Sequence, residues 1–154
     1  MDNDFARLSY EASLRSLDKQ EGLVDELRAR TGLLIAASSL AVSFLGRPAL
    51  AHAGTALVVL ALVAFALSVV SSLYVLMPKS GLVFSLAGSA LYEGLFDFRD
   101  DMAEVYRRVT YELDRFWESN DVRLQRLFLA FRVAAFALGV EVVLLLASVA
   151  DNLS

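Results

Sequence analysis

The sequence predicts an all-α membrane protein with three transmembrane helices and a cytosolic helical stalk that is continuous with them. Its 154 residues are 57% hydrophobic, against roughly 45–50% in an ordinary soluble domain. Residues 31–78 contain one charged side chain, Arg47, whereas the remaining 106 residues contain 31 of the 32 charges. A long uncharged block between charge-rich blocks excludes a simple soluble globule, a disordered chain and a basic nucleic-acid-binding module. We expect residues 1–154 to form a single domain.

The first element is a cytosolic helix over residues 2–30, which opens with Asp and Asn residues suited to capping. This acidic start differs from a cleavable signal peptide, so the first apolar run should be a real anchor. The apolar residues of the helix lie close to a 3/4 spacing, at Leu14, Leu17, Val24, Leu27 and Thr31. The pattern continues without a break, and we expect one long helix that enters the membrane near Thr31.

Three apolar runs predict transmembrane helices over residues 31–50, 54–78 and 127–150. The uncharged part of the first run, Thr31–Gly46, spans about 24 Å as a helix, which is short of the roughly 30 Å hydrocarbon core and needs extension to residue 50. A turn over Gly46–Gly54 leads to the second run, which carries no charge. The third run contains Arg132 and Glu141, but its content of Leu, Val, Ala and Phe still favours a span.

The distribution of Lys and Arg predicts the orientation in the membrane. Residues 1–30 carry five of them, the connection 47–53 carries one and residues 79–126 carry seven. We therefore expect a bacterial cell (inner) membrane protein with a cytoplasmic N-terminus and an outside C-terminus.

Residues 79–126 are expected to form a cytosolic insert followed by a helix. The helix is indicated by a stripe with 3/4 spacing that includes one polar residue, and its members are Met102, Val105, Val109, Leu113, Phe116, Asn120, Leu124 and Leu127. This helix should run into the third span and pack against the helix over residues 2–30 to form the stalk. The preceding segment, residues 80–98, fits either an interfacial helix or a hairpin that returns to the stalk.

A stripe of small residues runs along the first span, spaced 4, 3, 4 and 3, and comprises Gly32, Ala36, Ser39, Ser43 and Gly46. Small residues let membrane helices approach closely, and serines can bond across the contact. The stripe therefore predicts a helix–helix interface, or a pore in an oligomer that is lined by Ser39 and Ser43.

Glu141 lies near the middle of the third span, where a carboxylate costs a few kcal/mol. It would either bond to serines or another subunit, or face a water-filled path, unless the span boundary is misplaced. Arg132 is nine residues away, about 13 Å along one helix, so the two do not pair within the chain.

Basic and aromatic residues of the stalk suit a phosphate and a base, respectively. The residues in question are Arg28, Arg30, Arg107, Arg108, Arg115, Arg123, Arg126 and Trp117. The alternative is a solvated, salt-bridged helix face, because acids outnumber bases nine to seven over residues 79–126.

The composition argues against a catalytic site or a metal site. The chain has no cysteine and a single histidine, His52, and it has no phosphate-binding glycine loop. We expect no enzyme activity, no metal site and no cofactor.

Two stretches of the chain resemble known membrane proteins. The segment Glu26–Gly46 is similar to the first membrane helix of small actinobacterial-type membrane proteins, and the stretch from Tyr106 through Asn120 to Arg132 and Glu141 is similar to their last helix. The layout resembles the SLATT-type and related transmembrane effectors of bacterial antiphage defence, among which a Hailong-type channel effector fits the size. The resemblance implies a homo-oligomeric channel, with a tetramer favoured, whose opening is controlled by a short deoxyadenylate oligomer that a partner nucleotidyltransferase makes.

The function expected from these features is an oligomeric gated ion channel that acts as a membrane effector in antiphage defence. Its partners would be the lipid bilayer, further copies of the chain and an anionic nucleotide or short DNA ligand. The alternative function is a non-conducting membrane scaffold or a subunit of a larger complex.

Overall fold

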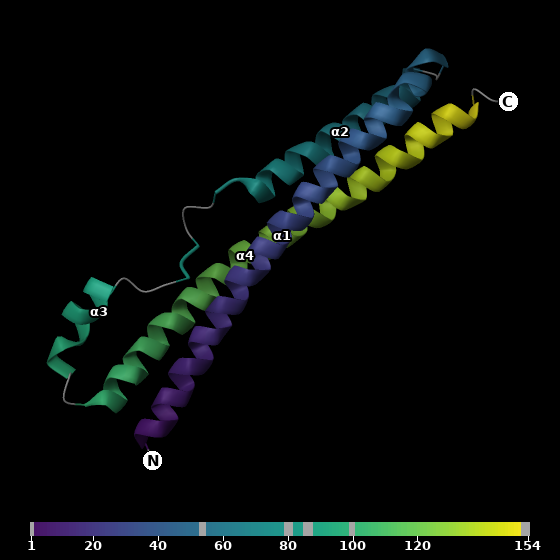
Figure 1. Cartoon of the computed structure of the whole chain (residues 1–154). Helices are drawn as coiled ribbons and strands as arrows, with labels where there is room; N and C mark the ends of the chain where they lie inside the picture. Colours follow the sequence, from purple (N-terminus) through teal and green to yellow (C-terminus); the bar gives the residue numbers. More distant parts are fainter. Residues whose placement is uncertain (1, 53–54, 79–81, 85–87, 99–100, 152–154) are drawn as a thin grey trace. The chain divides into compact units, whose positions relative to one another are not determined.

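The computed structural model describes residues 2–52, 55–78, 82–84, 88–98 and 101–151. Within these residues the chain forms helices and no strand: α1 (Asp2–His52), α2 (Thr55–Leu76), α3 (Gly88–Leu95), the short 3-10 helix η1 (Phe96–Phe98) and α4 (Met102–Asp151) (Figure 1). Three of them, α1, α2 and α4, are long and apolar enough to cross a membrane. The chain is thus an all-α membrane protein, as predicted.

The helices α1 and α4 each combine a charge-rich part with an apolar part. Helix α1 contains both the predicted residues 2–30 and the first span in 51 residues, and α4 contains the predicted stripe and the third span in 50 residues. The prediction that the charged helices continue into the spans is confirmed. The predicted turn over Gly46–Gly54 is wrong for residues 46–52, because α1 continues to His52. Proline lacks the backbone N–H but the helix tolerates Pro48, and the alanines and leucine that follow it are good helix formers.

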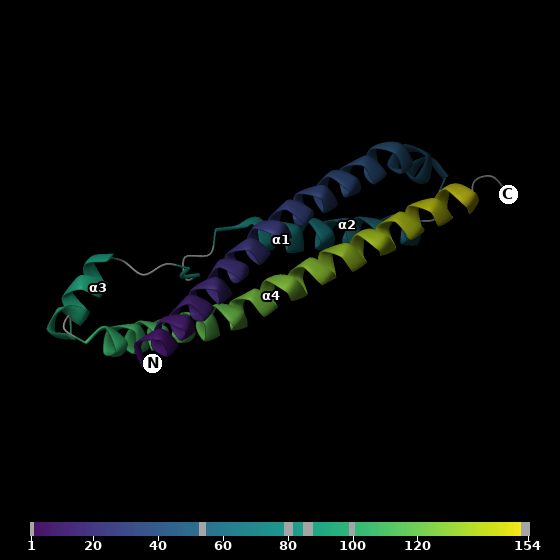
Figure 2. The same ribbon diagram turned by 60° about the horizontal axis from the view of Figure 1, so that its bottom comes forward.

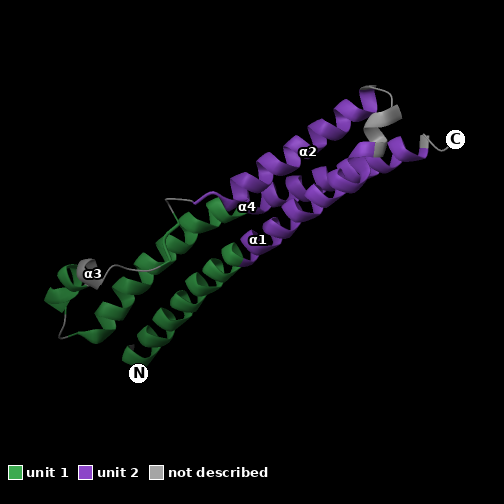
Figure 3. Cartoon of the chain, turned by 45° about the horizontal axis from the view of Figure 1, so that its top comes forward, with its two compact units in different colours: residues 1–25, 79–125 green, residues 26–78, 126–154 purple. Residues whose placement is uncertain are grey.

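The chain divides into two compact units, which Figure 3 shows in different colours. Unit 1 comprises residues 1–25 and 79–125, and unit 2 comprises residues 26–78 and 126–154. The boundaries therefore fall inside α1 and inside α4. That the two units form a single domain stays a prediction.

The core of unit 1 is an apolar cluster between α1 and α4. Leu17, Val109 and Leu113 are buried, and partly buried hydrophobic residues surround them, namely Tyr10, Leu95, Val105 and Phe116. Seven of the eight residues of the predicted α4 stripe are buried or half-buried, whereas Met102 at its start is exposed. On α1, Leu14 is also exposed, and Gln20 takes the inward position that the sequence pattern did not assign to it.

The segment between α2 and α4 returns to this core. Leu95, near the end of α3, packs against the cluster of Leu17, Val109 and Leu113, and the Arg108 guanidinium lies over the Phe98 ring at 3.9 Å from its centroid. Of the two alternatives for residues 80–98, the contacts fit the one that returns to the stalk. Residues 79–81 and 85–87 lie outside the described part of the chain.

Asn120 attaches residues 82–84 to α4. Its side chain is 1% exposed; Nδ2 donates to the Val83 carbonyl at 2.8 Å, and Oδ1 accepts from the Val83 amide at 3.1 Å. This reciprocal pair explains why a polar residue stands in an otherwise apolar stripe.

Unit 2 is a bundle of three helical segments. The segments of α1 and α4 run in the same direction and α2 runs in the opposite direction, as both Figure 1 and Figure 2 show. Ala61 and Leu145 form a buried contact between α2 and α4, with Leu45 of α1 packed against it. Three consecutive spans must alternate in direction, and these three segments do so.

We predict that Asn120→Ala destabilises unit 1 by about 1–3 kcal/mol, because two hydrogen bonds between the buried Asn120 side chain and the Val83 backbone are lost. The measurement is hydrogen exchange at residues 82–84 in the detergent-solubilised protein, which should become faster. The neighbouring Ser119 is exposed, so Ser119→Ala is the matched control and should change little. Unchanged exchange in Asn120→Ala would contradict this role.

Candidate functional site

The candidate site lies in unit 2, where a carboxyl group from α4 meets a hydroxyl group from α1. The Ser38 Oγ donates a hydrogen bond of 2.8 Å to Glu141 Oε2. Glu141 is 0% exposed and Ser38 is 1% exposed. The second carboxyl oxygen, Oε1, has no hydrogen-bond partner among the described residues. Of the alternatives for Glu141, the contact fits bonding to a serine.

The helical repeat explains why these two side chains meet. On α4 the buried stripe of unit 1 continues in steps of seven residues, through Leu127, Ala134, Glu141 and Ser148. On α1, Ser38 follows the buried Thr31 by seven residues. Residues seven apart return to nearly the same face of a helix. Ser38 and Glu141 therefore point inward, as do the buried residues seven positions before them, Thr31 and Ala134.

Helix α2 has a buried face of mainly small side chains. Its buried face is spaced 3, 4, 4 and 3 and consists of Ala61, Ala64, Ser68, Ser72 and Val75. The Ser68 Oγ donates to the Ala134 carbonyl on α4 at 3.2 Å, while the buried Ser72 Oγ has no partner among the described residues. The small face lets α2 approach α4 closely.

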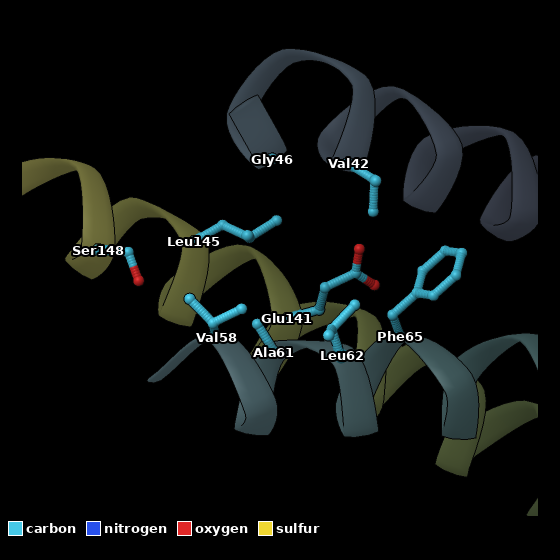
Figure 4. Close-up of a pocket in the computed structure, with 9 residues that line it drawn as sticks. All are labelled: Val42, Gly46, Val58, Ala61, Leu62, Phe65, Glu141, Leu145 and Ser148. Carbon is cyan, nitrogen blue, oxygen red and sulfur yellow. The ribbon is translucent and has the colours of Figure 1, made fainter. Parts of the chain in front are cut away.

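A cavity of about 60 Å³ adjoins the carboxyl group. Its wall is mainly carbon, with Val42 from α1, Leu62 and Phe65 from α2, and Leu145 from α4. Figure 4 shows the Glu141 carboxyl group pointing between Val42 and Phe65. Apart from Glu141, the polar side chain in the lining is that of Ser148, whose Oγ donates to the Leu144 carbonyl of its own helix.

The predicted small-residue stripe of α1 divides into two parts. Gly32, Ala36, Ser39 and Ser43 are exposed in the single chain, whereas Gly46 is buried and lines the cavity. The Ser39 Oγ donates to the Ile35 carbonyl at 2.9 Å, and the Ser43 Oγ donates to the Ser39 carbonyl at 2.7 Å. The exposed part therefore makes a face of α1 that is separate from the face holding Ser38.

The arginines predicted to bind a ligand are distributed over both units. In unit 2, Arg30 pairs with Glu26 on its own helix, Arg28 is half-buried, and Arg126 is exposed. In unit 1, Arg107 and Arg108 both pair with Glu104. The remaining unit 1 residues of this set are exposed, namely Arg115, Trp117 and Arg123.

One of these arginines borders a wide cavity in unit 1. The cavity measures about 550 Å³, and Arg107 lines it together with Asp101, Glu104 and two rings, those of Phe5 on α1 and Tyr111 on α4. Both rings are about 70% exposed, at 72% for Phe5 and 70% for Tyr111. The wall thus combines one guanidinium and two aromatic faces with two carboxylates.

Several residues of the site were missed by the sequence reasoning. It placed Ser39 and Ser43 at a helix–helix interface or in a pore lining, and it assigned no role to Ser38 and Ser148. A usable signal was present, because extending the α1 stripe seven residues beyond Thr31 leads to Ser38. Extending the α4 stripe seven residues beyond Glu141 leads to Ser148.

Comparison of the chain with protein-family models, with curated proteins and with solved structures found no match. The functional conclusions below therefore rest on the residues, their contacts and the resemblance of the sequence segments.

We predict that Ser38→Ala destabilises the protein by about 1–3 kcal/mol, because the buried carboxyl group loses its hydrogen-bond donor. The measurement is the thermal unfolding midpoint in detergent. Ser39→Ala removes the same hydroxyl one position away, on the exposed face, and should stay within about 0.5 kcal/mol of the wild type. In a Glu141→Ala background the effect of Ser38→Ala should shrink, and equal effects in both backgrounds would refute the coupling.

Proposed function

We propose that the chain assembles into an oligomeric gated ion channel that acts as a membrane effector in antiphage defence. The observation that carries the proposal is the exposed small-residue face of α1, formed by Gly32, Ala36, Ser39 and Ser43. Within one chain the face that holds Ser38 is occupied by α4, so the small-residue face is available to a second copy. Three spans enclose no useful pore by themselves, and small residues favour close association of membrane helices.

The antiphage role and the control by a nucleotide or oligonucleotide signal are supported by the sequence resemblance described above. The same resemblance favours a tetramer, a partner nucleotidyltransferase and a bacterial cell membrane with the N-terminus in the cytoplasm. Binding of a ligand can gate such a channel only if the ligand binds the open and closed states with different affinity.

The cavity beside Arg107 is the ligand site that we favour in unit 1. The Phe5 and Tyr111 rings offer faces on which nucleobases stack, and the Arg107 guanidinium can approach a phosphate once it leaves Glu104. The carboxylates of Asp101 and Glu104 repel a ligand that carries a high density of negative charge. This opposition favours a ligand held chiefly through its bases.

A specific observation favours the alternative, a non-conducting scaffold. The hydroxyl groups of Ser39 and Ser43 donate to carbonyl groups of their own helix. Their donors are therefore satisfied without water, as a dry helix–helix contact requires.

We predict that the purified protein in liposomes passes ions when single-stranded oligodeoxyadenylate is added, and that Ser39→Leu abolishes this flux while the oligomer persists. The larger leucine side chain on the small-residue face would narrow an ion path that this face lines. Ala37→Leu is the matched control, because Ala37 is exposed among Leu33 and Leu40 on another face of α1, and it should conduct normally.

The outcomes separate the two functions. Loss of oligomer and of toxicity together in Ser39→Leu would favour the scaffold. The absence of flux from pure protein with every nucleotide tried would refute the channel.

We predict further that Tyr111→Ser weakens binding of oligodeoxyadenylate about 5-fold to 150-fold, because one stacking contact contributes about 1–3 kcal/mol. Binding is measured with a labelled oligonucleotide and the full-length protein in detergent. Tyr92→Ser is the control, since Tyr92 is an exposed ring of unit 1 that does not line the cavity beside Arg107. Equal losses in both variants, or no loss in Tyr111→Ser, would exclude this site.

A further inference from the structure

Among the described residues, no basic side chain pairs with the carboxyl group of Glu141. The nearest basic residue on its own helix is Arg132, nine positions earlier, which is exposed. On α1 the nearest basic side chain to Ser38 is Arg30, paired with Glu26, and the next is the exposed Arg47, nine positions after Ser38. Nine residues correspond to about 13 Å along a helix. Helix α2 contributes no Asp, Glu, Lys, Arg or His between Thr55 and Leu76; its one titratable side chain is the phenol of Tyr74.

An ionised carboxylate in apolar surroundings is costly unless a charge or several donors compensate it. Here the donor is a single hydroxyl group, that of Ser38, and Oε1 is left without a partner. A species that neutralises the carboxyl group would therefore stabilise it in this position, and the adjoining cavity offers a route to it.

The cavity lacks the ligands that a metal cation needs. Hard cations take about six to eight oxygen ligands, whereas the side-chain oxygens in the lining are those of Glu141 and Ser148. No cluster of three metal-binding side chains occurs in the described part of the chain. A proton, in contrast, needs one oxygen atom.

We propose that Glu141 is a proton-binding site within the membrane, and that its proton exchanges through the adjoining cavity. The carboxylate and a proton combine to form the neutral carboxyl group, with the O–H bond on Oε1 and the Ser38 hydrogen bond kept on Oε2. The cavity of about 60 Å³ has room for water, and a water molecule beside Oε1 can accept the hydrogen bond from the new hydroxyl group. This site goes beyond the proposed function, because it follows whether or not the oligomer conducts ions.

The test is infrared spectroscopy of the full-length protein in lipid membranes, which distinguishes the C=O stretch of a neutral carboxyl group from the bands of a carboxylate. At neutral pH the wild type should show a neutral carboxyl band that is lost in Glu141→Gln. The matched control is Glu118→Gln, since Glu118 is exposed in unit 1, and it should keep the band. Exchange into D₂O and titration to alkaline pH should respectively shift and remove the band.

A second pair of variants covers the case in which Glu141→Gln fails to fold. Ser38→Ala keeps Glu141 but removes the hydrogen bond to its carboxyl group, so the band should shift in frequency, whereas Ser39→Ala should leave it in place. Identical neutral carboxyl bands in the wild type and Glu141→Gln would overturn the proposal. A band that resists both D₂O and alkali would overturn exchange through the cavity.

Discussion

A single buried stripe along α4 organises both units. Its members follow a 3/4 spacing over most of the helix and include Val109, Leu113, Asn120, Leu124, Leu127, Ala134, Glu141, Leu145 and Ser148. In unit 1 the stripe packs against Leu17 of α1, and in unit 2 it meets Ser38 of α1 and Ser68 of α2. Each unit is built around the same face of one helix, so the other elements are positioned by what that face presents.

The polar members of the stripe supply directional contacts within an apolar interface. Packing of similar apolar side chains tolerates a shift by one helical turn, whereas a hydrogen bond between two particular side chains does not. Glu141 selects the Ser38 side chain, whereas Asn120 bonds to the backbone of Val83. Gln20 adds a third such contact in unit 1, because its Nε2 donates to the Trp117 carbonyl. We infer that the bond between the Ser38 and Glu141 side chains determines the register of α1 against α4 in unit 2.

The fold was largely predictable from the sequence. The nearly uncharged run over residues 31–78 indicates membrane spans, and the 3/4 spacing of apolar residues indicates which side of each helix is buried. The partners of the polar residues were less predictable. Glu141 was recognised as exceptional from its position in a span, but the small-residue stripe drew attention to Ser39, whereas the apolar stripe of α1, extended seven residues beyond Thr31, leads to Ser38. Small residues on α1 formed an obvious pattern, and most of that pattern is exposed in the single chain. The wide cavity in unit 1 is lined by both Phe5 and Tyr111, which are 106 positions apart in the sequence, so no local pattern predicts it.

The pairing of Ser38 with Glu141 also bears on how the chain enters the bilayer during synthesis. Helix α2 carries no charge and can insert unaided, whereas the last span must bring Arg132 and Glu141 with it. The partner of Glu141 is on α1, which is synthesised more than 100 residues earlier. When the last span emerges from the ribosome, α1 has already been synthesised, so its Ser38 hydroxyl group can donate to the Glu141 carboxyl group. Insertion of the third helix is therefore expected to depend on the first two, so that membrane integration and folding are one process for this chain.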